Sequence, residues 1–374
     1  MQRNEDGRYR RSVSTTRFNA KPTRGAVTVR WPILAMHTDL KPIEPRKALE
    51  LYLDDRRGDL ADWTLRSHRS RLSTFIDWCE EERIGNLNEL TGRDIHRYKV
   101  WRRNDGDLSK VTVKTQIDTV RVFAKWLASI EGCDPELPAK IKSPSLAKGE
   151  NARSVELHSD EATKILTYLE KYHYCTLPHV TLSLLWHGLM RRGAVRAIDL
   201  RDYYPDEQYL DLKHRPESDT PLKNGTGGER PIAVSESVCE LLDDWVADKR
   251  PNSTDEYGRK PLLATSQGRI HLTTIQQYVY MWSRPCKYGA DCPHDRDPDD
   301  CSSANERYSA SECPSSISPH AVRRGSITHW LREEIPQPVV SDRADVSADV
   351  LDAHYDERTS LEKMEQRRKF LDNI

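Results

Sequence analysis

The chain has no long apolar run and no excess of charge of either sign. No stretch of 18 apolar residues occurs among its 374 residues, which argues against a membrane-spanning helix. The amino-terminal end is polar and arginine-rich and lacks the apolar centre of a secretory signal, so we expect a cytoplasmic protein. Lys and Arg number 58 and Asp and Glu 59, so net charge says nothing about a polyanionic partner.

Disulfides are also not expected, because the eight cysteines of an intracellular protein should be reduced. Four of them cluster in the polar stretch 286–313, and they are Cys286, Cys292, Cys301 and Cys313. They could supply four thiolates for a structural Zn²⁺, with His294 competing for one position. Unligated thiols and a redox disulfide are the alternatives. A closed site of this kind would stiffen the loop and take no part in catalysis.

The length fits two domains with flanking segments. Residues 1–40 are rich in Lys and Arg without periodicity, which is typical of a flexible basic arm or an ordinary solvated tail. Residues 41–135 have helical periodicity, with a cap at Ser109, and predict a bundle of about four helices. Residues 136–155 break that periodicity and predict a linker, and 156–374 form the second domain.

Basic side chains recur on the helices of the first domain, away from the apolar faces. They are Arg66, Arg69, Arg97, Lys99, Arg102, Arg103, Lys114 and Arg121. A solvated helix face has this composition, and so does a surface that contacts DNA, so the pattern by itself leaves both open.

The second domain mixes helices with a short hairpin. "YLDLKH" and "ERPIAV" alternate like strands and flank "RPESDTPLKNGTGG", whose Asn-Gly and Gly-Gly steps indicate turns, so Lys223 is expected on a hairpin. The segments around it, including "TLPHVTLSLLWHGLMRRGAVRAIDL", predict helices, with a turn at Gly193 between two of them. The expected fold is therefore mainly α with a small β-hairpin or sheet, an α+β arrangement.

Four motifs follow one another in this domain: "WHGLMRRGAVRAIDL", "TPLKNGTGGER", "SPHAVRRGS" and "LDAHYDE". The third sets His320 and Arg323 three residues apart on one face of a helix start, and Tyr355 follows in the fourth. In this order the motifs resemble those of the tyrosine recombinases of the phage-integrase and Xer-type family, and their residues resemble the archaeal branch of that family. The resemblance covers about residues 45–374.

The resemblance implies a helical core-binding domain and a catalytic domain that cuts and rejoins double-stranded DNA through a 3′-phosphotyrosine, without a cofactor. The implied catalytic residues are Arg191, Lys223, His320, Arg323 and Tyr355. Guanidinium groups suit the charge that develops on a phosphodiester, so Arg191 and Arg323 would clamp it. Tyr355 would be the nucleophile, Lys223 would protonate the leaving oxygen, and His320 would assist proton transfer or bind phosphate.

Some positions depart from the family pattern or offer a competitor. Nine residues before Tyr355, where the family has His or Trp, stands Val346, and the nearby Arg343 could substitute in contacting phosphate. Three residues after Arg191, where an acidic residue is frequent, stands Ala194. Two further arginines compete with the chosen ones, and they are Arg192 beside Arg191 and Arg324 beside Arg323.

Three classes of function remain open at this point. A site-specific recombinase or integrase is the expected one, with a type IB topoisomerase sharing its chemistry. An inactive relative that binds DNA as a regulator is motivated by Val346. A metal-dependent nuclease would need carboxylates for Mg²⁺ that do not accompany the cysteines.

For a recombinase we expect a nucleoid-associated protein that is a dimer on one site and a tetramer in synapsis. Residues 360–374 form an amphipathic tail that would pack on its own domain or on a neighbouring protomer.

Overall fold

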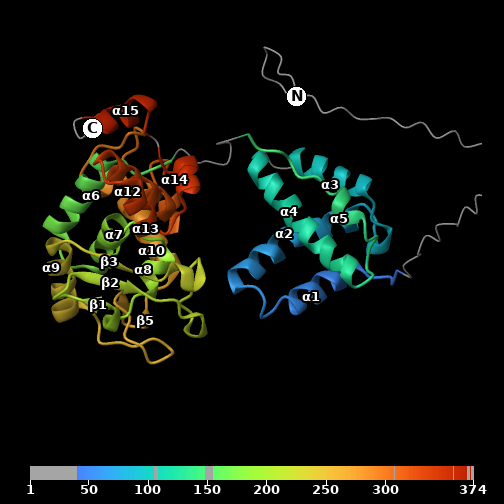
Figure 1. The fold of residues 1–374 in the computed structure, drawn as a ribbon, viewed down its shortest axis with the longest axis horizontal. Coiled ribbons are helices and arrows are strands. Elements are labelled where there is room, and N and C mark those ends of the chain that lie inside the picture. The colour runs from blue at the N-terminus through green and yellow to red at the C-terminus, as the bar shows by residue number, and fades with distance from the viewer. Residues whose placement is uncertain are drawn as a thin grey trace, which may run out of the picture. The chain divides into compact units, whose positions relative to one another are not determined.

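The computed structural model describes residues 40–104, 108–147, 155–306, 308–356, 358–368 and 371 (Figure 1). It divides into two compact units, Met1–Pro144 and Ser145–Ile374. The expected basic arm, apart from its last residue, lies outside the described residues. In the described part of the chain, no helix has the length and apolar character needed to cross a membrane.

Unit 1 is a helical bundle, as its periodicity predicts. Its helices are α1 (Pro45–Asp55), α2 (Asp62–Glu81), the 3-10 turn Leu87–Glu89, α3 (Gly92–Asn104), α4 (Lys110–Ser129) and the short α5 (Leu137–Lys140). Ser109 caps α4 by accepting a hydrogen bond from the main-chain N–H of Thr112, which confirms the predicted helix start. Aromatic rings hold the core together: Tyr98 packs edge-on against Phe75, with ring centroids 5.0 Å apart.

The first part of the expected linker packs on unit 1 in the structure. Leu137 and Ile141 are buried in its core. Arg121 donates from Nε to the carbonyl of Ile141 at 3.0 Å and from Nη2 to the Ser143 hydroxyl at 2.6 Å. Loss of periodicity therefore marks the end of the long helices but not the end of the packed unit, because isolated apolar residues still bury themselves.

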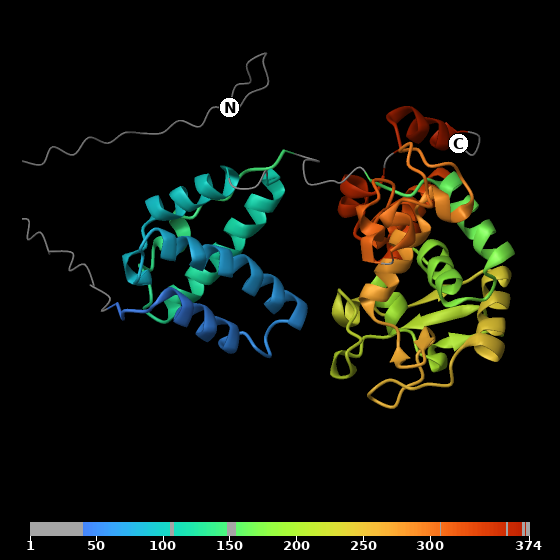
Figure 2. The ribbon, with the colours of Figure 1, turned by 180° about the vertical axis from the view of Figure 1, so that it is seen from behind.

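Unit 2 contains the remaining elements (Figure 2). Its helices are α6 (Ser159–Tyr172), α7 (Leu177–His187), α8 (Arg192–Ala197), α9 (Glu236–Asp244), α10 (Leu272–Trp282), α11 (Ser302–Asn305), α12 (Pro319–Arg332), α13 (Gln337–Ala344), α14 (Ala348–His354) and α15 (Ser360–Arg368). Its strands are β1 (Tyr203–Tyr204), β2 (Tyr209–Leu212), β3 (Arg230–Ala233), β4 (Ala264–Thr265) and β5 (Gly268–Arg269).

The sheet confirms the predicted hairpin. Strands β1, β2 and β3 pair antiparallel in that order, with Leu210 opposite Ile232, and both of these side chains face the core. Helix α7 is buried along nearly its whole length and runs through the same core. In Figure 1 the helices α12, α13 and α14 lie together, above the sheet in this view, and β3 reaches them where Arg230 donates from Nε to the Arg343 carbonyl at 2.9 Å.

The turn between α7 and α8 differs from the prediction. We expected it at Gly193, but Gly193 lies inside α8, and the chain turns at Leu189, whose φ is +52°. The buried side chain of Leu189 packs into the cluster that also holds Tyr355, and this packing stabilises a conformation that a non-glycine residue seldom adopts. The turn places Arg191 at the residue before α8.

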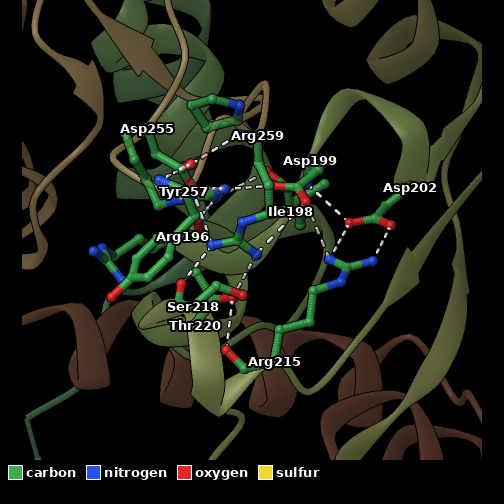
Figure 3. Close-up of polar contacts among 12 residues, drawn as sticks. Arg196, Ile198, Asp199, Asp202, Arg215, Ser218, Thr220, Asp255, Tyr257 and Arg259 are labelled. Atoms are coloured by element: carbon green, nitrogen blue, oxygen red, sulfur yellow. Dashed lines mark hydrogen bonds and ion pairs between the residues drawn. The ribbon is translucent and has the colours of Figure 1, made fainter.

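An ion-pair network fastens the segment that leads to Lys223 (Figure 3). Arg215 donates from Nη2 to Asp202 Oδ1 at 2.6 Å, and Arg259 donates from Nη1 to the Thr220 hydroxyl at 3.0 Å. The other charged members are Arg196, Asp199, Asp219, Asp255 and Arg269. The loop between β2 and β3 therefore begins from an anchored segment, although Lys223 itself is exposed.

Candidate active site

Helix α12 carries two of the predicted site residues close to its first turn. Pro319 occupies the first helical position, where its missing N–H is no loss, so the chain enters the helix in a fixed direction. His320 is exposed beside it. Arg323, one turn later, is only 1% exposed, and its Nη1 and Nη2 donate to the main-chain carbonyls of Leu189 and Ala344. Arg323 thus joins α12 to the α7–α8 turn and to the end of α13.

Tyr355 lies against this helix. It follows α14 directly and is 5% exposed, and its carbonyl accepts a hydrogen bond from the Thr328 hydroxyl of α12 at 2.8 Å. The His320 ring meets the Tyr355 ring edge-on, with centroids 5.7 Å apart. The guanidinium carbons of Arg323 and Arg324 lie 5.9 Å and 6.0 Å from the Tyr355 ring centroid. The structure therefore brings the His-x-x-Arg motif and the tyrosine together.

Arg191 joins the same group through an acid that the sequence did not single out. Its Nη1 donates to Asp345 Oδ2 at 2.5 Å, and its Nη2 donates to the Asp345 carbonyl at 2.9 Å. The competitor Arg192 donates instead to the Gln276 side chain on α10. The geometry therefore favours Arg191 over Arg192 as the member of the site.

The loop that carries Lys223 reaches the same acid. Asn224, next to Lys223, donates from Nδ2 to Asp345 Oδ1 at 2.6 Å. The carboxylate of Asp345 is thus held by groups from two distant parts of the chain, Arg191 and Asn224. Asp345 has a left-handed backbone conformation at the end of α13, with φ of +51°, which an aspartate tolerates better than most residues do.

Desolvation and the neighbouring cations lower the pKa of His320. Desolvation where its ring packs on the protein, and after it the positive charges of Arg323, Arg324, Lys223 and Arg191, together lower the pKa of His320 to about 4. At neutral pH His320 is uncharged, and it can accept a proton or a hydrogen bond.

At position 346, where the family has His or Trp, this chain has a valine that packs in the apolar core. Val346 is 8% exposed and lies in the same apolar cluster as Tyr355. Arg343 does not fill the position, because its Nη2 donates to the His187 carbonyl at 2.9 Å and its guanidinium carbon lies 4.6 Å from the Trp330 ring centroid.

Arg230 is the cation that sequence reasoning missed. It begins β3, donates from Nη1 to the Gly228 carbonyl at 2.7 Å, and lines a polar cavity of about 270 Å³ together with Asp345 and Val346. Burial lowers the pKa of Arg230, while the charge of Asp345 raises it. The sequence could have pointed to Arg230 only as a basic residue at the start of a strand, just after the Lys223 loop. Such residues are common, so this pattern is weak evidence for a site residue.

The cysteine cluster lies apart from these residues, in the segment between α10 and α12. All four predicted cysteines, together with His294, line one cavity of about 20 Å³. In the described part of the chain, no three His, Cys, Asp or Glu side chains already stand close enough together to hold a metal ion. The zinc site stays a prediction at this point.

Comparison with known proteins finds matches to the amino-terminal domain of phage integrases. Residues 49–130 match the family model described as phage integrase, N-terminal SAM-like domain. The N-terminal domain of a phage integrase/site-specific recombinase from Haloarcula marismortui is 36% identical, and the match covers 28% of this chain and 99% of that chain with a TM-score of 0.27. The chain belongs to the tyrosine recombinase family. Among curated proteins, none matches it.

Solved structures of tyrosine recombinases share the fold of both units. The Tn1549 transposon integrase in complex with transposon right end DNA is 14% identical, with a TM-score of 0.60 over 88% of this chain and 100% of that chain. A lambda integrase dimer bound to a COC' core site is 14% identical, with a TM-score of 0.57 over 86% of this chain and 97% of that chain. At these identities the likeness establishes the two-domain recombinase fold, as the motifs predicted.

Proposed function

We propose that this tyrosine recombinase is an active site-specific recombinase or integrase that cuts and rejoins DNA through a 3′-phosphotyrosine on Tyr355. One observation supports the proposal above the others: His320, Arg323 and Arg324 converge on the Tyr355 ring. A phosphodiester is anionic, and its transition state concentrates further negative charge on the non-bridging oxygens. A tyrosine surrounded by fixed cations is suited to that charge.

The proposed cleavage step is a transesterification. The Tyr355 oxygen bonds to phosphorus while the bond to the 5′-oxygen breaks, and Lys223 supplies the proton that the 5′-oxygen needs. Neutral His320 accepts the phenolic proton. The phosphotyrosine keeps the energy of the phosphodiester, so attack by a 5′-hydroxyl reverses the step on a new strand without ATP. Arg191 and Arg323 hold the phosphate, for which Arg191 exchanges its contact with Asp345, and Arg323 its contacts with main-chain carbonyls, for phosphate oxygens.

Asp345 has a defined part in this proposal. Its carboxylate occupies the position beside Arg191 that a phosphate oxygen would take, with Oδ2 2.5 Å from Arg191 Nη1. A bound phosphodiester must therefore compete with Asp345 for Arg191. In the DNA-free chain Asp345 compensates the cations, and it gives up part of that contact when DNA enters.

DNA would also contact unit 1. A groove of about 550 Å³ is lined by the basic residues Arg121, Lys125 and Lys142. Lys125 is exposed, whereas Arg121 is tied to Asp118 and to the carbonyl of Ile141. We therefore assign phosphate contacts to Lys125 and Lys142 and a structural role to Arg121. The exposed Arg66 and Arg69 on α2 are further candidates.

Assembly follows the same proposal, because one tyrosine per chain cleaves one strand and exchange between two duplexes needs four cleavages. A lambda integrase tetramer bound to a Holliday junction is among the similar structures. In this chain, α15 carries Leu361 and Met364, which are 66% and 41% exposed. Such apolar exposure at the chain end suits docking on a neighbouring protomer in a dimer or tetramer.

The decisive experiment is covalent trapping. A duplex nicked near the cleavage site loses a short fragment after cleavage, so the adduct accumulates and survives SDS. Wild type should form it, and Tyr355→Phe should form none while still binding DNA. Tyr308→Phe is the matched control, because Tyr308 is 82% exposed in the same unit and should be dispensable. An adduct that persists in Tyr355→Phe would assign the nucleophile elsewhere.

The second candidate is a relative that binds DNA without cutting it, which the apolar Val346 at the family's His or Trp position favours. The same experiment separates the two functions. Specific binding by wild type with no adduct on any nicked substrate would support the binding protein. An adduct in wild type excludes it.

A further inference from the structure

Four thiols from separate turns of the chain surround one cavity in unit 2. Cys286 lies in the 3-10 turn Pro285–Tyr288, Cys301 is the residue before α11, and Cys313 follows the 3-10 turn Tyr308–Glu312. Cys292 completes the set, and each thiol is free and partly buried. The cavity of about 20 Å³ has room for roughly one water-sized body. Its lining and size are those of a site for a single ion.

Among the described residues, no carboxylate forms an ion pair with the arginine beside this cavity. Arg284 is 2% exposed, its Nε donates to the Met281 carbonyl at 3.1 Å, and its Nη1 has no hydrogen-bond partner among the described residues. It also lines the cavity, as do Cys286, Cys301 and Cys313. A buried guanidinium is costly unless an anion faces it.

We propose that Cys286, Cys292, Cys301 and Cys313 bind one structural Zn²⁺ as thiolates and that Arg284 is the counter-charge of the complex. Four thiolates and Zn²⁺ together carry two negative charges, and a buried guanidinium offsets one of them while its free N–H donates to sulfur. The proposal therefore explains both the gathered thiols and the unpaired arginine. It stands independently of the DNA chemistry.

Four thiolates suit the geometry better than three thiolates and His294. The His294 Nε2 is already hydrogen-bonded to the Ser315 hydroxyl, at 2.8 Å. Zinc would draw the four sulfurs to about 2.3 Å from a common centre, and all four already line the one cavity. Metal binding thus completes the site and orders the thiols, which are not yet at coordination distance.

The metal would fix the start of α12. The segment after the last cysteine is bonded to α10 and its end: Ser316 donates from its hydroxyl to the Tyr280 carbonyl at 2.9 Å, and Ile317 N donates to the Ser283 hydroxyl at 3.1 Å. His320 lies three residues further on. A closed zinc site next to these bonds would hold the entry to α12 in place.

The first test is the metal content of protein purified without a metal-affinity step. Elemental analysis should find about one zinc per wild-type chain, and each of the four Cys→Ser variants should lose most of it. Cys239→Ser is the matched control, because Cys239 is buried in the core outside the cavity and should leave the zinc unchanged. Absence of zinc from wild type that also fails to take up added Zn²⁺ would overturn the proposal. A disulfide found by mass in the unreduced protein would do so as well.

A second test uses wild type alone, so it does not depend on the variants folding. Titration with a thiol reagent should release zinc in proportion to the modification of four cysteines. Release without those thiols reacting would contradict the ligand set. Replacement by Co²⁺ should give the intense charge-transfer absorption of four thiolates, and His294→Ala should leave it unchanged.

Arg284 is tested through metal affinity. Arg284→Met should weaken Zn²⁺ binding about 10-fold to 100-fold in competition with a chelator, as loss of an outer-shell partner generally does. Arg284→Lys keeps the charge and should recover most of the affinity. Equal affinities of wild type and Arg284→Met would remove the arginine from the proposal.

Discussion

Asp345→Asn tests whether Asp345 is the internal counter-ion of the active site. The carboxylate accepts hydrogen bonds from Arg191 Nη1 at 2.5 Å and from Asn224 Nδ2 at 2.6 Å. These contacts hold its negative charge beside the predicted catalytic cation Arg191. Asparagine has the same shape and tolerates the left-handed backbone at this position, with φ of +51°, so the substitution changes charge without straining the chain.

The substitution should change stability and DNA affinity in opposite directions. A hydrogen bond to a charged group contributes about 1.5 to 3 kcal/mol and a neutral one about 0.5 to 1.5, so unit 2 should lose about 1 to 2 kcal/mol. That loss corresponds to a fall in Tm of roughly 2 to 8 °C for a unit of this size. Removing one negative charge about 4 Å from a bound phosphate, in solvent-like dielectric, is worth about 1 kcal/mol, or roughly fivefold tighter DNA binding.

Two measurements on the same preparation check this. Differential scanning calorimetry gives the Tm, and fluorescence anisotropy with a labelled duplex at fixed salt gives Kd. Asp206→Asn is the control for net charge, because Asp206 is exposed in the turn between β1 and β2. It should change neither quantity much. A variant that loses stability and binds DNA no better than wild type would show that Asp345 only holds the fold together.

Three further predictions follow from particular contacts. Gly325→Ala should destabilise unit 2 by about 1 to 3 kcal/mol in chemical unfolding, because the new Cβ would lie 1.8 Å from the Leu157 carbonyl oxygen, whereas Gly193→Ala has open space and should be neutral or slightly stabilising; equal stabilities would refute the close approach. Since the lowered pKa keeps His320 neutral, the single-turnover cleavage rate should show no inflection near pH 6.5 that His320→Ala abolishes, and such an inflection would contradict the lowered pKa. Log affinity for DNA should fall linearly with log salt, and Lys125→Ala should reduce that slope by about 0.9 if it contacts a phosphate, while an unchanged slope would remove it from the interface.

Much of the fold could be predicted from the sequence because its determinants are local. The helices of unit 1 follow from the spacing of apolar residues, and Ser109 caps α4 as predicted because a cap involves only neighbouring residues. The β2–β3 pairing follows from two alternating segments around turn residues. His320 and Arg323 share a helix face because three residues make nearly one turn.

Other features depended on the whole fold. The turn expected at Gly193 forms at Leu189, because burial of the leucine side chain outweighs the cost of its backbone conformation. Residues from 137 onward, expected in a linker, pack on unit 1 because their few apolar side chains find a core to fill. Neither outcome is encoded in a short window of sequence.

Short motifs in the sequence predict the reactive groups and their order, from Arg191 to Tyr355. That Arg191 contacts Asp345, whereas Arg192 contacts Gln276, could be learned only from the folded chain. Arg191 and Asp345 are 154 residues apart, and their contact exists because packing of α8 and α13 brings the two charges together. Local patterns fix what each segment can do, whereas electrostatic partners are chosen by distance in space.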